Sequence, residues 1–94
     1  MEKGAASDPR IQRSGLDFVV DIHGMKAYPA KRYLQSILPG LSRDKDASAL
    51  VVVHGYRSGT ALRDMVRGEL KSPFIQSRRP GMSDGHTVLI LNKK

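Results

Sequence analysis

The chain has 94 residues, which is enough for one small domain with a single hydrophobic core. Its 16 lysines and arginines against 9 aspartates and glutamates give a formal net charge of +7, and this excess favours polyanionic partners such as nucleic acid. The absence of cysteine excludes disulfides, thiolate metal sites and a cysteine nucleophile, and it is compatible with a reducing cytoplasm.

The N-terminal residues 1–14 differ in composition from the rest of the chain. They are small, polar or charged except for one large aliphatic residue, Ile11, so we expect a flexible tail there and a single domain over residues 15–94. They lack the apolar core of a signal peptide, and no apolar run in the chain reaches the roughly 20 residues of a membrane span. We therefore expect a cytoplasmic protein without membrane contacts.

The first half of the domain is predicted to form a strand followed by a helix. Residues 16–23 show the alternation of a strand with one face toward the core, and that face would carry Leu16, Phe18, Val20 and Ile22. Residues 29–38 have apolar side chains at helical spacing, and the dipeptide Pro39-Gly40 should end this helix. The residues expected on its buried side are Ala30, Tyr33, Leu34, Ile37 and Leu38.

The second half is predicted to add a buried strand, a helix and a hairpin. Residues 49–53 (ALVVV) form a short, unbroken apolar run that is typical of a central strand. A helix should begin within residues 58–61, end at Ser72-Pro73, and bury Leu62, Met65, Val66 and Leu70. Strands over 74–79 and 86–91 flank a turn-rich segment, PGMSDG. This order, β-α-β-α-β-β, predicts a two-layer α/β sandwich with a mixed four-stranded sheet.

Both predicted strand-to-helix turns begin with the dipeptide His-Gly, at His23-Gly24 and at His54-Gly55. Ligands in open α/β sheets gather at the carboxyl ends of parallel strands, so we expect both imidazoles at one edge of the sheet. Asp21 precedes His23 by two residues, which separates their backbone positions by about 6 to 7 Å in an extended strand. A direct contact would require the two side chains to point toward each other. Asp21 could then orient the imidazole or help to hold Mg²⁺, although no metal-ligand spacing is evident.

The loop after the second strand reads HGYRSGT, from His54 to Thr60. A nucleotide-triphosphate P-loop requires G-x-x-x-x-G-K-[ST], and the shorter gap and missing lysine exclude that activity. Gly59 would permit close approach of a phosphate, and Ser58 or Thr60 could cap the following helix. Two tyrosines, Tyr28 and Tyr56, are expected outside the core and able to stack on unpaired bases, with the loop residue the better candidate.

A basic surface is predicted around the second helix. Arg63, Arg67 and Lys71 are spaced at i, i+4 and i+8, where their mutual repulsion would be relieved by a polyanion. Arg57 precedes this row and Arg78-Arg79 follows it, which favours a surface that tracks a nucleic acid backbone. A simply solvated basic face is the alternative.

The two His-Gly motifs resemble those of the small MutS-related (Smr) domain family. Its members carry L-D-x-H-G after the first strand and H-G-x-G-x-G after the second, and the chain has VDIHG at 20–24 and HGYRSG at 54–59. The similarity extends over about residues 16–92. It implies a sandwich like the C-terminal domain of translation initiation factor three, and endonuclease activity on DNA or RNA, in some members at stalled ribosomes.

The resemblance implies that Asp21 and His23 form the catalytic pair and that His54, Gly55 and Gly59 form the second half of the site. Our leading hypothesis is therefore an endonuclease in which His23 is the general base or acid and His54 protonates the leaving oxygen. The chain departs from the family at Arg57, which replaces a glycine. The predicted nucleic-acid-binding residues are Gly24, Gly55, Tyr56, Arg57, Ser58, Gly59, Thr60, Arg63, Arg67, Lys71, Arg78 and Arg79.

Two other hypotheses remain open from the sequence. One is a non-catalytic module that binds DNA, RNA or the ribosome, and the other is an interaction domain for an acidic protein. The sequence does not choose between RNA and DNA.

Overall fold

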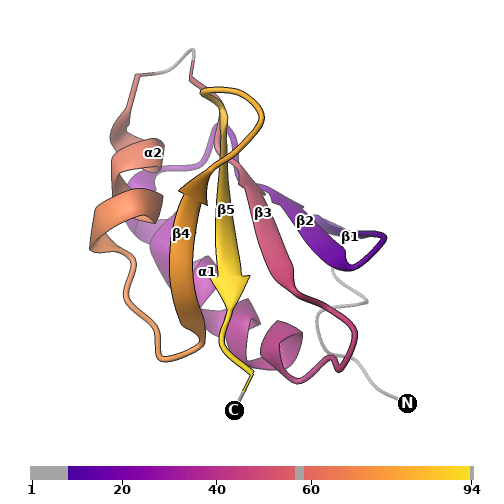
Figure 1. The fold of residues 1–94 in the computed structure, drawn as a ribbon. Coiled ribbons are helices and arrows are strands. Elements are labelled where there is room, and N and C mark those ends of the chain that lie inside the picture. Colours follow the sequence, from indigo (N-terminus) through magenta and orange to yellow (C-terminus); the bar gives the residue numbers. More distant parts are fainter. Residues whose placement is uncertain (1–8, 57–58, 94) are drawn as a thin grey trace.

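The computed structural model describes residues 9–56 and 59–93, which form a layer of strands and a layer of helices (Figure 1). The elements are β1 (Ile11–Ser14), β2 (Asp17–Asp21), α1 (Ala27–Ser42), β3 (Ala49–Val53), α2 (Ala61–Asp64), the π-helical segment η2 (Met65–Glu69), β4 (Ile75–Pro80) and β5 (His86–Leu91). The predicted α/β sandwich is confirmed. No helix within the described residues is both long and apolar enough to cross a membrane.

The sheet is mixed and has five strands in the order β1-β2-β3-β5-β4. Strands β2 and β3 are parallel, whereas β3 pairs with β5 and β5 with β4 in antiparallel fashion. The predicted parallel pair and the C-terminal hairpin are therefore confirmed. The fifth strand, β1, was not predicted.

Strand β1 corrects the end of the expected flexible tail, because residues 11–14 pair with β2 along its outer edge, whereas residues 1–8 of that prediction lie outside the described residues. Ile11 enters the core with 7 % of its surface exposed, and Gly15 supplies the positive φ of 62° for the tight turn between the strands. Leu16 is the second turn residue and is 62 % exposed, so its predicted place in the core is wrong. A single aliphatic residue was too weak a signal for a strand that is stabilised mainly by edge pairing.

Helix α1 continues past the predicted stop at Pro39-Gly40, with Pro39 inside it. Proline removes one backbone hydrogen bond from a helix interior. Leu38 and Leu41 lie on either side of this dipeptide and are both fully buried. Their burial offsets the lost bond, because each large aliphatic side chain contributes about 1.5–3 kcal/mol when it leaves water.

One hydrophobic core lies between the sheet and the helices. Phe18 and Val20 on β2 and Ile22 directly after it are buried, as predicted. The helical residues predicted to be buried are found there too, namely Ala30, Leu34, Ile37, Leu38, Met65, Val66 and Leu70, whereas Tyr33 and Leu62 are half-buried against this core. The second helix differs from prediction in its geometry, since only α2 is α-helical and the next five residues form η2.

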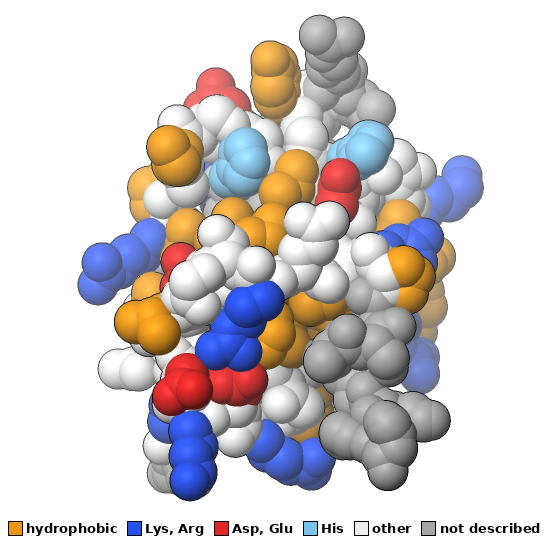
Figure 2. Space-filling view, turned by 90° about the vertical axis from the view of Figure 1, so that its right-hand side faces the viewer, with side chains coloured by type: hydrophobic (Ala, Val, Ile, Leu, Met, Phe, Trp, Pro, Cys, Tyr) orange, Lys and Arg blue, Asp and Glu red, His pale blue; other side chains and the backbone are white. Residues whose placement is uncertain are grey.

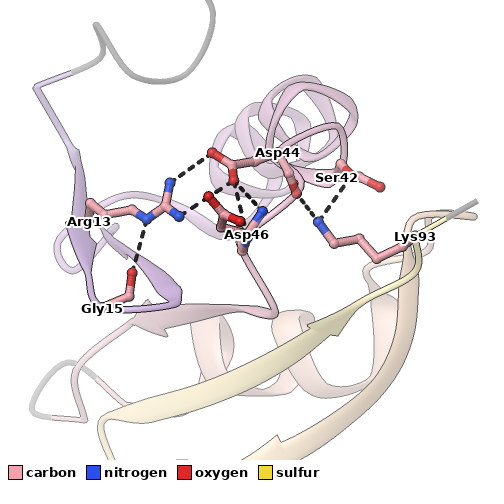
Figure 3. A network of polar contacts seen from close by, with 7 residues as sticks. Arg13, Gly15, Ser42, Asp44, Asp46 and Lys93 are labelled. Atoms are coloured by element: carbon pink, nitrogen blue, oxygen red, sulfur yellow. Dashed lines mark hydrogen bonds and ion pairs between the residues drawn. The ribbon is translucent and has the colours of Figure 1, made fainter.

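A polar network ties the β1–β2 hairpin to the end of α1 (Figure 3). The Arg13 guanidinium donates to the Asp44 carboxylate at 2.7 Å and to the Gly15 carbonyl at 3.1 Å. The hydrogen bond from Arg13 lowers the pKa of Asp44 below its ordinary value. The Lys93 ammonium group also donates to the backbone carbonyls of Ser42 and Asp44. The network holds the hairpin in place, although its first strand, β1, lies within the predicted tail.

Candidate functional site

The carboxyl ends of β2 and β3 lie side by side, and the two His-Gly turns start there. Asp21 is paired with Val53 in the parallel register, and the next amide, that of Ile22, donates to the Val53 carbonyl at 2.9 Å. A Cβ atom added to Gly55 would lie only 3.4 Å from the Cβ of His23. The two turns are therefore in contact at one edge of the sheet, as the parallel pairing predicts.

Asp21 and His23 form a directly hydrogen-bonded pair. One carboxylate oxygen, Oδ1, accepts from the His23 ring nitrogen Nδ1 at 2.5 Å and from the His23 backbone amide at 3.0 Å. A turn makes this contact possible: the Met25 amide donates to the Ile22 carbonyl, and Gly24 has a positive φ of 84°. The side chains that an extended strand would hold apart therefore meet.

The pair has the arrangement of a general base. Because a carboxylate only accepts hydrogen bonds, the proton of the neutral imidazole is on Nδ1, and Nε2 of His23 keeps a lone pair. The His23 side chain is 69 % exposed, so this nitrogen is open to a ligand. Partial burial would raise the pKa of Asp21, but the hydrogen bonds from His23 outweigh it and the pKa is lowered. The carboxylate is therefore ionised at neutral pH and holds the His23 ring in the tautomer that carries its proton on Nδ1.

His54 has a different environment and is only 3 % exposed. Its Nδ1 donates to the Gly55 carbonyl at 3.0 Å, and its Nε2 lies 2.8 Å from the Thr87 hydroxyl oxygen. The Arg67 Nε also donates to this oxygen, at 2.8 Å. Since arginine can only donate, Thr87 accepts from Arg67. Since the neutral imidazole carries its proton on Nδ1, its Nε2 accepts the proton of the Thr87 hydroxyl. Burial, opposed by the bond to Gly55 and assisted by the Arg67 charge, lowers the pKa of His54, so this imidazole is neutral.

Both ring nitrogens of His54 are thus used inside the protein, which fits a positioning role better than the predicted proton transfer to a leaving oxygen. The backbone amides of His54 and Gly55 donate to the Gly85 carbonyl at 2.9 and 3.0 Å, which ties this turn to the β4–β5 loop. Gly85 permits the contact, because a Cβ there would lie 3.3 Å from the Gly55 Cα atom. Thr87 was not among the predicted site residues. The sequence feature that could have identified Thr87 is its hydroxyl group, which lies on the otherwise apolar, buried face of β5.

The burial of His54 predicts a pH-dependent stability. Its pKa in the folded state lies below the value of about 6.5 that is typical of unfolded chains, so the unfolded state binds the proton first as the pH falls. The free energy of unfolding should be fully retained above about pH 6.5 and should decrease below it. Urea unfolding of wild type and His54→Gln at a series of pH values checks this. If the free energy of unfolding depends on pH in the same way for both proteins, His54 is not the cause of the pH dependence.

A pocket of about 490 Å³ opens at this edge and is lined by residues of both His-Gly turns, including His23 and His54. The predicted residues Gly24, Gly55, Tyr56 and Gly59 also line it, together with apolar side chains and Lys26. Figure 2 shows two histidine side chains on the surface at the upper end of the molecule, one of them next to a carboxylate, whereas His54 adds little to this surface because it is only 3 % exposed. Sequence reasoning missed Lys26, because it belongs to no motif.

A second pocket of about 490 Å³ also reaches His23 and has a more polar lining. Its lining includes Gln12 of β1, Asp21 of β2 and Arg10, which directly precedes β1. His23 is therefore shared by an apolar pocket and a polar pocket. The predicted tail over residues 1–14 left out Arg10 and Gln12, because a flexible segment would not contribute to a pocket.

The predicted basic helix face is not present as a continuous row. Leu70 has an extended conformation after η2, so Lys71 lies beyond the helix and cannot share a face with Arg63 and Arg67. Arg67 is bonded to Thr87 and to the His86 carbonyl. The periodic spacing was misleading because the π-helical turn and the extended Leu70 interrupt the α-helix.

The remaining predicted binding residues lie in different surroundings, and their role in binding stays a prediction. The Arg78 guanidinium donates to the Val66 and Leu70 carbonyls at the end of η2, so it serves as a helix C-terminal contact. Arg79 is exposed and lines a smaller pocket of about 230 Å³ with Arg67 and Arg78. Thr60 does not cap α2 but donates to Asp64 at 3.0 Å. The predictions for Arg57 and Ser58 lie outside the described residues.

Among residues 9–56 and 59–93 no three histidine, aspartate or glutamate side chains are grouped so as to hold a metal ion. Asp21, the predicted candidate for Mg²⁺, is engaged by His23.

Comparison with known proteins adds no family assignment. A scan against protein-family models found no match for this sequence, and a search of the curated proteins found none. The similarity of the two His-Gly motifs to Smr domains therefore stays a hypothesis that rests on the residues themselves.

Proposed function

We propose that this protein is a cytoplasmic phosphodiesterase that cleaves within nucleic acid chains, as the Smr-like motifs imply. The observation that carries the proposal is the Asp21–His23 pair, which offers an exposed proton acceptor backed by an ionised carboxylate. The pair lies between two pockets in a chain with a net charge of +7. A basic protein with a general base at a concave site fits a polyanionic substrate.

In this proposal His23 accepts a proton at Nε2 from the attacking oxygen, which belongs to water or to a ribose 2′-hydroxyl. The new phosphorus–oxygen bond forms as the bond to the leaving oxygen breaks, and the leaving oxygen takes a proton from solvent. Asp21 stabilises the imidazolium that forms, as a carboxylate does in other His-dependent enzymes. Arg10 and Lys26 line the pockets on either side of His23 and place positive charge near the phosphate.

A non-catalytic nucleic-acid-binding module, acting on its own or on the ribosome, is the second candidate. It is favoured by the internal hydrogen bonds of His54, which leave His23 as the exposed histidine of the apolar pocket. A module of this kind needs no second acid–base group. It would bind through charge and stacking alone.

One experiment separates these functions. End-labelled RNA and DNA, single-stranded and duplex, are incubated with wild type and with His23→Gln, in Mg²⁺ or in chelator, and both mobility and product length are recorded. We expect shortened products with wild type and none with the variant. Retention at low salt without any product would favour the binding module. Neither retention nor product would overturn the proposal and favour an acidic protein as partner.

A further inference from the structure

We propose that the apolar pocket next to His23 receives one unpaired base of the substrate, so that the site selects single-stranded or flipped-out nucleotides. This inference rests on the proposed function and names the substrate class of that site. It is carried by three features of the pocket: its apolar walls, an exposed aromatic ring at the site, and the position of the Asp21–His23 pair.

The walls of the pocket suit the flat face of a base. Met25, Ala27 and Leu62 line it, and all three are partly buried against the hydrophobic core, which holds them in place. A volume of about 490 Å³ lies within the range of about 300–1,000 Å³ that is usual for small-molecule sites. Apolar walls offer a phosphate group few hydrogen-bond donors, whereas they pack well against an aromatic ring.

Tyr56 supplies a stacking surface at this pocket. Tyr56 is 62 % exposed, although it lies only two residues after the buried His54. Gly85 supports the ring, because a Cβ atom at that position would lie 3.3 Å from Tyr56 Cδ1. The ring is therefore backed by the β4–β5 loop while much of it stays in contact with solvent. Stacking of a base on such a ring is tolerant of sequence.

The position of His23 links the base to the chemistry. His23 lines the apolar pocket and also the polar pocket that contains Arg10 and Gln12. A base in the apolar pocket would leave its sugar and phosphate at His23 and direct the neighbouring nucleotide toward the polar pocket. A base in a duplex is held in the stack and must be extruded before it can enter, so unpaired nucleotides bind at lower energetic cost.

The test compares oligonucleotides of equal length and equal phosphate charge. Binding of His23→Gln protein to single-stranded oligothymidylate is compared with its binding to an oligomer of abasic tetrahydrofuran units. We expect the oligomer with bases to bind about 5- to 150-fold more tightly. Adding Tyr56→Ala should remove most of this ratio. Tyr28→Ala is the matched control: Tyr28 was the second stacking candidate of the sequence and is 63 % exposed on α1, but it lies outside the pocket lining and its hydroxyl accepts from Arg32.

Equal binding of the two oligomers would overturn the inference, and so would an equal effect of Tyr28→Ala and Tyr56→Ala. A cleavage assay with wild type keeps the two proposals distinguishable. If paired and unpaired RNA and DNA are cleaved at equal rates, the base pocket is wrong and the phosphodiesterase stands. If binding depends on the bases and no substrate is cleaved, the base pocket stands and the phosphodiesterase is wrong.

Discussion

Replacing His23 with glutamine is expected to lower the rate of nucleic acid cleavage by about 10²- to 10⁴-fold, the usual contribution of a positioned general base. Glutamine keeps a polar side chain that can still bond to Asp21, but it cannot take up a proton. The loss should therefore appear mainly in kcat and only weakly in substrate binding. Rates measured under single-turnover conditions, together with binding constants for the same oligonucleotide, check this expectation.

His86→Gln is the control for this prediction, because His86 is a half-buried histidine at the start of β5 whose Nδ1 contacts the Ser83 hydroxyl. It does not line the pocket beside His23. We expect wild-type cleavage from this variant. The cleavage rate of Asp21→Asn should lie between those of His23→Gln and His86→Gln. The asparagine amide can still accept a hydrogen bond from His23, but it no longer stabilises a positive charge. Unchanged cleavage by folded His23→Gln protein would show that His23 is not the base.

Periodicity predicted the strands whose two faces differ. Residues 17–21 and 86–91 each have one face in the core, and residues 49–53 form a central strand. The apolar pattern of these segments therefore indicates which side chains are buried. Strand β1 has no such pattern, because it lies at the edge of the sheet and only Ile11 is buried. The extension of α1 past Pro39 likewise depends on core contacts of Leu41, which local stop signals do not include.

The candidate site could be predicted where topology alone determines it. Two neighbouring parallel strands that are each followed by a His-Gly turn must bring both turns to one edge of the sheet, and they do. The hydrogen bonds that each side chain forms at this edge could not be predicted, because their partners are distant in the sequence. His54 meets Thr87 across 33 positions of sequence, and Arg78 is directed to backbone carbonyls of η2. Charge spacing is a poor guide when a guanidinium has such internal acceptors.

Replacing Thr87 with valine is expected to destabilise the protein by about 1–3 kcal/mol, the usual loss when buried polar groups are left without a partner. Thr87 is fully buried, and its hydroxyl both accepts from Arg67 and donates to His54. Valine has nearly the same shape, so the change removes the hydrogen bonds with little effect on packing. Urea unfolding at neutral pH measures the loss, and a variant as stable as wild type would contradict it.

Thr87→Ser separates the hydroxyl from the methyl group, because serine keeps the link between Arg67 and His54. If Thr87 positions the His54-Gly55 turn through this link, Thr87→Ser should retain cleavage while Thr87→Val loses activity at temperatures where it is still folded. The stability effects of Thr87→Val and Arg67→Met should also be less than additive, since both remove the same hydrogen bond. Additive effects would mean that the three residues do not act as one network, and His54 would then be held by the Gly55 carbonyl and the Gly85 loop alone.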